Sequence, residues 1–118
     1  MKILVVDDEQ AQRESLCRGI HLFGYQCQSA ADSDEALQLL GEGGPCPFDL
    51  MVTDLTMPGC SGFQLMEAAW KQRPGLKVLL ITGSLSLRDA VAARCKKVPV
   101  LLKPFDLDQL EVAIEDLF

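Results

Sequence analysis

Asp54 is a carboxylate that follows directly on a short apolar run in the sequence. The run at 50–53 is rich in β-forming residues, and proline bounds it on both sides. The pattern predicts a buried strand followed by a loop, and Ser61 and Gln64 have the capping-box spacing that should open a helix. Loops that follow such strands usually hold the functional groups of α/β proteins. On this stretch alone, two interpretations stay open: Asp54 caps its own turn, or it takes part in chemistry.

Other polar side chains stand at or just after the ends of predicted strands. Asp7 and Asp8 follow the first apolar run, Thr82 ends another, and Lys103 follows the last. Because the carboxyl ends of parallel strands meet at one edge of a sheet, we expect Asp7, Asp8, Asp54, Thr82 and Lys103 to gather there. Each motif alone has a simpler explanation as a helix cap, a core residue or a solvated turn. Their joint occurrence favours a functional site.

Three carboxylates at one edge repel one another. Two unit charges about 4 Å apart interact by roughly 4 kcal/mol at an effective dielectric constant of about 20. Such a cluster either raises a pKa or holds a cation. Hard oxygen ligands without histidine or cysteine favour Mg²⁺, and a hydroxyl and an ammonium group suit phosphoryl oxygens. The set therefore has the parts needed to form an acyl phosphate on Asp54.

The elements that must position these residues form a regular alternation. We expect strands at 3–6, 25–30, 50–53, 77–82 and 98–102 and helices at 9–23, 33–40, 61–73 and 86–97, with a final helix capped by Asp106 and Gln109. Such alternation predicts an α/β fold with a parallel sheet covered on both faces. The first, third and fourth strands are the most apolar, and Pro99 suits an edge. The prediction is a doubly wound, flavodoxin-like (βα)5 sandwich with a five-stranded parallel sheet of order 2-1-3-4-5, in one domain spanning 1–118.

Two smaller features complete the expected architecture. The helix at 86–97 should bury a small apolar face formed by Leu87, Ala90, Val91 and Ala93. The glycine- and proline-rich stretch 41–47 should be a surface loop.

Composition narrows the function classes. A net charge of −6 disfavours direct binding of nucleic acid. No apolar run is long enough to span a membrane, and the start of the chain becomes acidic too soon for a signal peptide, so we expect a cytoplasmic protein without membrane contact. The five cysteines are odd in number and lack a C-x-x-C pair, which predicts reduced thiols rather than a disulfide framework or a zinc site.

The combined pattern resembles the receiver domain of two-component response regulators along the whole chain. The matching residues are Val5-Val6-Asp7-Asp8, Thr53-Asp54-Leu55, Met57-Pro58-Gly59, Gly62, Ile81-Thr82-Gly83 and Leu102-Lys103-Pro104-Phe105.

The resemblance implies a signalling phosphoacceptor rather than an enzyme. Asp54 would take a phosphoryl group from the phosphohistidine of a sensor histidine kinase or phosphotransfer protein. Asp7, Asp8 and Asp54, with the backbone carbonyl of Thr56, would hold Mg²⁺. Thr82 would reorient toward the phosphoryl group, Lys103 would pair with it, and the peptide bond before Pro104 would be cis. An attached output domain and a homodimer both stay open.

Two positions differ from the family pattern. The last strand usually carries an aromatic residue three positions before the lysine, which swings inward when the threonine moves. Here that position is Val100, whose side chain is short and stiff. The usual Gly-Ala before that strand is replaced by residues 97–99. We hypothesise that switching relies instead on Thr82 and the 83–87 loop.

Three other functions are alternatives. A flavin- or nucleotide-binding module of the same fold would need small residues after the first strand, whereas Asp7, Asp8 and Glu9 would repel a phosphate. An aspartate-nucleophile phosphatase would resemble D-x-D-x-[TV] at the first strand, which this sequence lacks. An interaction module that works without phosphorylation stays open, because Val100 could blunt the switch.

Overall fold

Strands and helices alternate along the chain in a computed structural model that describes residues 1–41, 44 and 46–118. The elements in order are β1 (Lys2–Val6), α1 (Gln10–Leu22), β2 (Gln26–Ala30), α2 (Ser33–Gly41), β3 (Leu50–Asp54), β4 (Thr56–Met57), β5 (Cys60–Ser61), α3 (Gly62–Gln72), β6 (Lys77–Thr82), α4 (Leu87–Lys96), β7 (Val100–Leu102) and α5 (Leu107–Glu115). The loop predicted at 41–47 falls partly outside the described residues. Among the helices so described, none is long and apolar enough to cross a bilayer.

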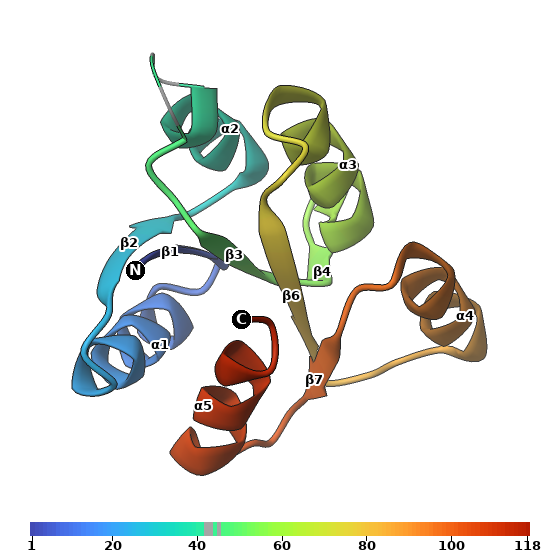
Figure 1. Cartoon of the computed structure of the whole chain (residues 1–118). Helices are drawn as coiled ribbons and strands as arrows, with labels where there is room; N and C mark the ends of the chain where they lie inside the picture. The colour runs from blue at the N-terminus through green and yellow to red at the C-terminus, as the bar shows by residue number, and fades with distance from the viewer. Residues whose placement is uncertain (42–43, 45) are drawn as a thin grey trace.

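The main sheet is parallel and has the order β2-β1-β3-β6-β7 (Figure 1). This confirms the predicted order 2-1-3-4-5, because β4 and β5 form a separate antiparallel pair. The prediction missed that pair, since two-residue strands have no periodicity to detect. In register, Val6 lies opposite Thr53 and Asp54 opposite Ile81, so the ends of the three central strands are level.

Helices cover both faces of the sheet, α1 and α5 on one side and α2, α3 and α4 on the other (Figure 1). Successive side chains of a strand point to opposite faces, so each central strand serves two cores. The core beneath α1 and α5 contains Ile3, Val5, Leu16, Ile20, Leu50, Val52, Leu79, Ile81, Leu110 and Ile114. The core on the other face includes Leu4, Val6, Ala36, Leu40, Met51, Leu65, Met66, Ala69 and Leu80.

The helix that follows Asp54 begins where the sequence predicts. Ser61 accepts a hydrogen bond from the backbone N–H of Gln64, whose side chain accepts one from the N–H of Ser61, so the capping box is complete. Gly62 comes next, and a Cβ atom there would lie 2.7 Å from the backbone oxygen of Asp54. The absence of a side chain at Gly62 therefore lets α3 begin directly against the end of β3.

The predicted apolar face of α4 is wrong for its two large residues and confirmed for Ala93. Leu87 and Val91 are 82% and 54% exposed, and Ala93 is the buried residue of this helix. The spacing of these residues suits a helix, but α4 lies over the short edge strand β7, which offers little apolar surface to cover it. Pro99 also lies before β7, and its carbonyl accepts a hydrogen bond from the N–H of Leu80.

The prediction of reduced thiols is wrong for one pair. Cys17 on α1 and Cys27 on β2 form a disulfide, with their Cα atoms 5.6 Å apart. The pairing follows from the packing of α1 against its neighbouring strand, and the spacing of cysteines in the sequence gives no sign of it. Cys46, Cys60 and Cys95 are free thiols.

Candidate functional site

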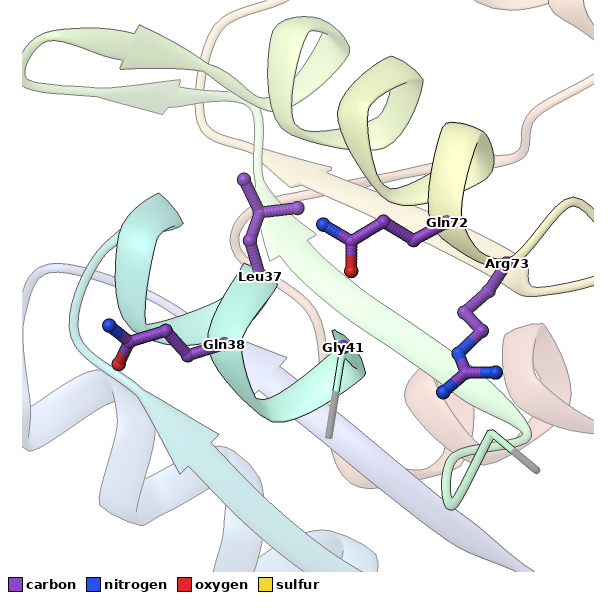
Figure 2. Close-up of a pocket in the computed structure, with 5 residues that line it drawn as sticks. All are labelled: Leu37, Gln38, Gly41, Gln72 and Arg73. Atoms are coloured by element: carbon purple, nitrogen blue, oxygen red, sulfur yellow. The ribbon is translucent and has the colours of Figure 1, made fainter. Parts of the chain in front are cut away.

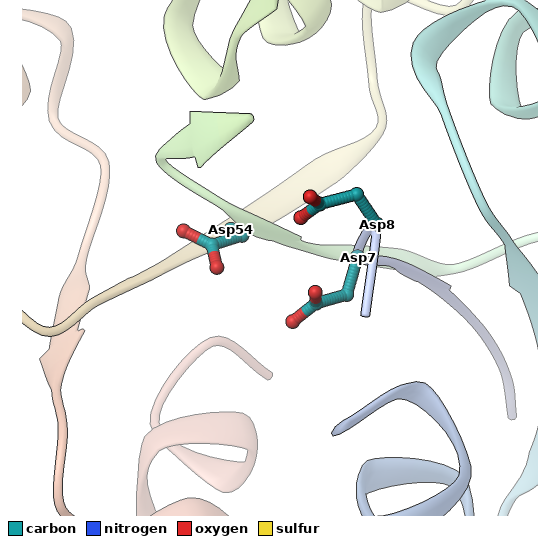
Figure 3. Close-up of side chains that lie close together, drawn as sticks. All are labelled: Asp7, Asp8 and Asp54. Carbon is teal, nitrogen blue, oxygen red and sulfur yellow. The ribbon is translucent and has the colours of Figure 1, made fainter. Parts of the chain in front are cut away.

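The ends of β1 and β3 bring three carboxylates together. Asp7 directly follows β1 and Asp54 is the last residue of β3. One oxygen from each of Asp7, Asp8 and Asp54 lies within 4.8 Å of the other two (Figure 3). Asp7 is buried, Asp54 is partly buried and Asp8 is exposed, so the cluster reaches from the core to the surface.

The surroundings of Asp7 disfavour its charge. Burial is the largest cause that raises the pKa of Asp7 above 3.8, and the negative charges of Asp54 and Asp8 raise it further. The backbone N–H of Glu9, which donates to Asp7 Oδ1 over 2.9 Å, and the positive charge of Lys103 lower the pKa and offset part of this effect. A cation among the three carboxylates would relieve the remaining repulsion.

Both oxygens of Asp54 have hydrogen-bond partners. Oδ1 accepts the backbone N–H of Thr56 over 3.0 Å, and Oδ2 accepts from Lys103 Nζ over 3.1 Å. The first bond closes a turn two residues after Asp54, as the capping interpretation predicts. The second joins Asp54 to a cation from the other end of the chain. The geometry therefore confirms the turn that the capping interpretation predicts, and it adds an ion pair between Asp54 and Lys103.

Lys103 reaches Asp54 from the end of β7. Its backbone N–H donates to the carbonyl of Thr82 over 2.8 Å, which continues the pairing of β7 with β6. The Lys103–Pro104 peptide bond is cis, as the resemblance implied. Lys103 Nζ also donates to the side-chain oxygen of Gln12, over 2.7 Å.

Gln12 was not predicted as part of the site. It precedes the buried residues Leu16 and Ile20 by one and two helical turns, so it lies on the sheet-facing stripe of α1. A polar residue on an otherwise apolar stripe is the signal that could have identified it.

Thr82 reaches the same edge of the sheet, at the end of β6. Its side chain is buried, and its hydroxyl donates to the carbonyl of Ser84 over 2.9 Å and accepts the N–H of Ser84 over 3.2 Å. The hydroxyl is thus held within its own loop. Thr56, the predicted carbonyl ligand, is exposed and lies in β4 directly after the end of β3.

Cavities elsewhere do not overlap this cluster. A cavity of about 680 Å³ lies between the ends of α2 and α3, lined by Leu37, Gln38, Gly41, Gln72 and Arg73 (Figure 2). Arg73 Nε there donates to the carbonyl of Leu40 over 2.8 Å. A second cavity, of about 480 Å³, adjoins the site, because Gln12 and Lys103 both line it.

Known proteins share this sequence pattern and fold. The family described as response regulator receiver domain matches residues 3–115. The response regulator MprA of Mycobacterium leprae is 34% identical over 118 residues, which are 99% of this chain and 50% of that protein. The regulatory protein AtoC of Escherichia coli K12 is 30% identical over 97% of this chain and 24% of its own length. The chain thus spans half or less of the length of these relatives.

Solved structures agree with the sequence matches. The chemotaxis protein CheY4 of Vibrio cholerae superposes with a TM-score of 0.88 at 26% identity, covering 99% of this chain and 98% of its own. The response regulator TrrA of Thermotoga maritima, solved in complex with Mg²⁺ and BeF, gives 0.84 at 30% identity, with coverage of 99% and 98%. The chain belongs to the response regulator receiver domains of two-component systems.

Proposed function

We propose that this chain is a phosphoacceptor whose Asp54 takes a phosphoryl group from the phosphohistidine of a sensor histidine kinase or phosphotransfer protein, in a reaction that needs Mg²⁺. The observation that carries the proposal is the position of Asp54, whose carboxylate lies close to an acidic pair and 3.1 Å from the ammonium group of Lys103. The partner kinase drives the signal, and the chain acts as its switch rather than as a conventional enzyme.

The three carboxylates fit Mg²⁺. They are hard oxygen donors within 4.8 Å of one another. Burial is the largest cause of the raised pKa of Asp7, and the charges of Asp54 and Asp8 add to it; a divalent cation would relieve that added repulsion. Asp7, Asp8 and Asp54 would hold the ion, with the backbone carbonyl of Thr56 as a further ligand. Bound Mg²⁺ would supply positive charge that offsets the repulsion between these carboxylates and an incoming phosphoryl group. The related TrrA was solved with Mg²⁺ and BeF, which supports the assignment.

The chemical step transfers one group without a change in oxidation state. A carboxylate oxygen of Asp54 forms a bond to phosphorus while the P–N bond to the histidine breaks, and the electron pair of that bond stays on the imidazole nitrogen. Asp54 reacts as the carboxylate and releases no proton. Lys103 keeps its positive charge and pairs with the phosphoryl oxygens.

Thr82 would report the reaction to the surface. To donate a hydrogen bond to the phosphoryl group, its hydroxyl must give up the bond that it now donates to the carbonyl of Ser84. The carbonyl of Ser84 then loses its donor, so the hydrogen bonding that holds Thr82 to the loop at 83–87 would change. This supports the hypothesis that Thr82 and the loop carry the switch.

An interaction module that works without phosphorylation is the second candidate. Val100 stands where the family has an aromatic residue, and it is already half-buried against the core beneath α2 and α3. A side chain so placed has no outward position from which to swing. In this alternative the acidic site is present, but the domain binds its partner in either state.

The remaining assignments follow from the proposed function. We propose a cytoplasmic location, where a sensor kinase would present its phosphohistidine. An output domain attached to the receiver, or a second copy of the chain, would receive the signal. Neither nucleic acid nor a membrane would contact this acidic domain directly.

Intact-mass measurement after incubation with acetyl phosphate and Mg²⁺ tests the proposal. The native protein should gain the mass of one phosphoryl group, and the Asp54→Asn variant should gain none. Asp49→Asn is a matched control, because Asp49 is exposed at the opposite end of β3 and accepts a hydrogen bond from Lys2 N–H. An unmodified native protein would refute the phosphoacceptor function and favour the interaction module.

A further inference from the structure

Gln12 accepts a hydrogen bond from the same ammonium group of Lys103 that pairs with Asp54. We propose that Gln12 is a positioning residue that fixes Lys103 for phosphoryl transfer, and that its amide oxygen sets the rate at which Asp54 is modified. The inference rests on the phosphoacceptor function proposed above. It adds a residue outside the acidic cluster and outside the motifs that carry the family resemblance.

The two contacts of Lys103 Nζ differ in what the reaction does to them. Nζ lies 3.1 Å from Asp54 Oδ2 and 2.7 Å from Gln12 Oε1. Asp54 is the group that changes when it is modified, so it cannot hold the ammonium in one place throughout. Gln12 keeps its oxygen unchanged before and after the transfer. It is therefore the fixed anchor of the pair.

Gln12 itself is well placed to act as an anchor. The start of α1 is tied to the end of β1, because Arg13 Nη1 donates to the carbonyl of Asp7 over 2.8 Å and the N–H of Glu9 donates to the Asp7 carboxylate. Gln12 lies on the sheet-facing side of this fixed first turn. It joins the first helix of the chain to Lys103, 91 residues later.

A neutral amide suits this role better than a charged group. An ammonium group has three N–H donors, and in the described part of the chain Lys103 Nζ uses two, on Asp54 and Gln12. The third is left for a phosphoryl oxygen. Because the amide carries no net charge, it holds Lys103 without cancelling the positive charge that the phosphoryl group needs.

The adjoining cavity explains why Lys103 needs an anchor. The cavity of about 480 Å³ is lined by apolar side chains such as Leu16 and Phe105, together with Gln12, Lys103 and Asp106. The four-carbon stem of lysine is flexible, and the adjoining cavity leaves its ammonium group room to move. The hydrogen bond to Gln12 limits this movement and keeps Nζ beside Asp54.

The test replaces Gln12 by methionine, which keeps the length of the side chain and its helix propensity but removes the acceptor. Gln10→Met is the matched control, because Gln10 is exposed on the same helix and donates to Glu14 instead. Both variants and the native protein are modified with acetyl phosphate at saturating Mg²⁺. Thermal unfolding confirms that the variants are folded, and calorimetric titration with Mg²⁺ alone measures metal binding.

We expect Gln12→Met to lower kcat roughly tenfold or more, because loss of a charge-assisted hydrogen bond in the transition state raises the activation free energy. The KM for acetyl phosphate and the affinity for Mg²⁺ should stay unchanged, since Gln12 lies outside the carboxylate cluster. Gln10→Met should behave as the native protein. A purely structural role for Gln12 would not produce this selective change in kcat.

A second readout is independent of phosphorylation. In ¹H–¹⁵N correlation spectra of lysine side chains, the ammonium signal of Lys103 should be visible in the native protein and lost in Gln12→Met, because exchange with water becomes faster. Gln12→Glu retains an acceptor and should retain the signal.

The outcomes separate the two proposals. Modification of the native protein at an unchanged kcat in Gln12→Met would overturn the role of Gln12 alone. A native protein that gains no phosphoryl group would overturn the proposed function, and the inference with it.

Discussion

Asp7→Asn should stabilise the metal-free protein while abolishing its stabilisation by Mg²⁺. The substitution removes one of three crowded negative charges. It keeps a side-chain oxygen that can still accept the N–H of Glu9, which now donates over 2.9 Å to Asp7 Oδ1. Under the proposed function the Asp7 carboxylate is a ligand of Mg²⁺, so the expected gain in stability comes with a loss of metal binding.

The magnitude follows from the geometry of the cluster. Two unit charges 4.8 Å apart repel by about 3.5 kcal/mol at an effective dielectric constant of about 20 and by about 0.9 kcal/mol in bulk water. Asp8 is exposed and therefore well screened, and Lys103 offsets part of the repulsion on Asp7. We expect a net gain of about 1–2 kcal/mol in the free energy of unfolding at neutral pH, or an increase of roughly 4–8 °C in Tm.

The sign of the pH dependence provides a separate check. Since the pKa of Asp7 is raised above 3.8 in the folded state, the folded protein binds more protons than the unfolded chain between these two values. The contribution of Asp7 to stability therefore falls as the pH rises from 3.8 through the raised pKa, and its cost is complete above it. Asp7→Asn should lose this component.

Urea unfolding with a chelator and with Mg²⁺ measures these effects. Trp70, the single tryptophan, is a suitable fluorescence probe, because it is half-buried and its Nε1–H donates to the carbonyl of Leu76 over 2.8 Å. Asp49→Asn, at an exposed position, should change neither the stability nor its response to Mg²⁺ appreciably. The reasoning fails if Asp7→Asn is less stable than the native protein in chelator, or if Mg²⁺ stabilises both proteins equally.

Three further predictions concern other parts of the molecule. Reduction of the Cys17–Cys27 disulfide, or Cys17→Ser, should lower the free energy of unfolding by about 2.7 kcal/mol, which is the chain-entropy value for a bridge across a sequence separation of 10. The control Cys95→Ser should change the stability little. Equal urea midpoints with and without reductant would contradict this prediction. Gly62→Ala places a Cβ atom 2.7 Å from the Asp54 carbonyl oxygen and should lower the free energy of unfolding by roughly 1–3 kcal/mol in the same assay. Gly75→Ala serves as the control, because nothing lies within 4 Å of a Cβ atom at that position. A Gly62→Ala variant as stable as the native protein would show that α3 can shift freely. Thr82→Ala should still be modified on Asp54, but the NMR shifts that modification produces at 83–87 should be lost, and shifts as large as in the native protein would place the switch elsewhere.

Local sequence patterns predicted most of the fold. Ser61 with Gln64, and Asp106 with Gln109, identify helix starts because a capping box involves only residues three apart. The uninterrupted apolar runs before Asp7 and Asp54 identify central strands, since only strands covered on both faces lack polar positions. Once the strands are parallel, the gathering of the carboxylates at one edge follows from topology.

Features that depend on distant packing were not predicted. The contact between Gln12 and Lys103 joins residues 91 apart, and neither residue type indicates the other. The Cys17–Cys27 disulfide depends on how closely α1 packs against β2. Leu87 and Val91 have helical spacing but lie at a sheet edge too short to cover them. In each case the local sequence pattern describes the element itself correctly. The contacts of that element depend on the surface against which it packs, which the local pattern does not contain.

The late position of Lys103 in the chain has a consequence for synthesis on the ribosome. All three acidic residues emerge within the first half of the chain, whereas their cationic partner follows β6 and α4 and becomes available only with β7. A nascent domain that has already paired β1 with β3 therefore carries uncompensated negative charge at the tip of its sheet. Docking of the last strand neutralises part of that charge. The Lys103–Asp54 ion pair can therefore stabilise only a chain that includes β7 and Lys103, and a product truncated before Lys103 lacks this ion pair.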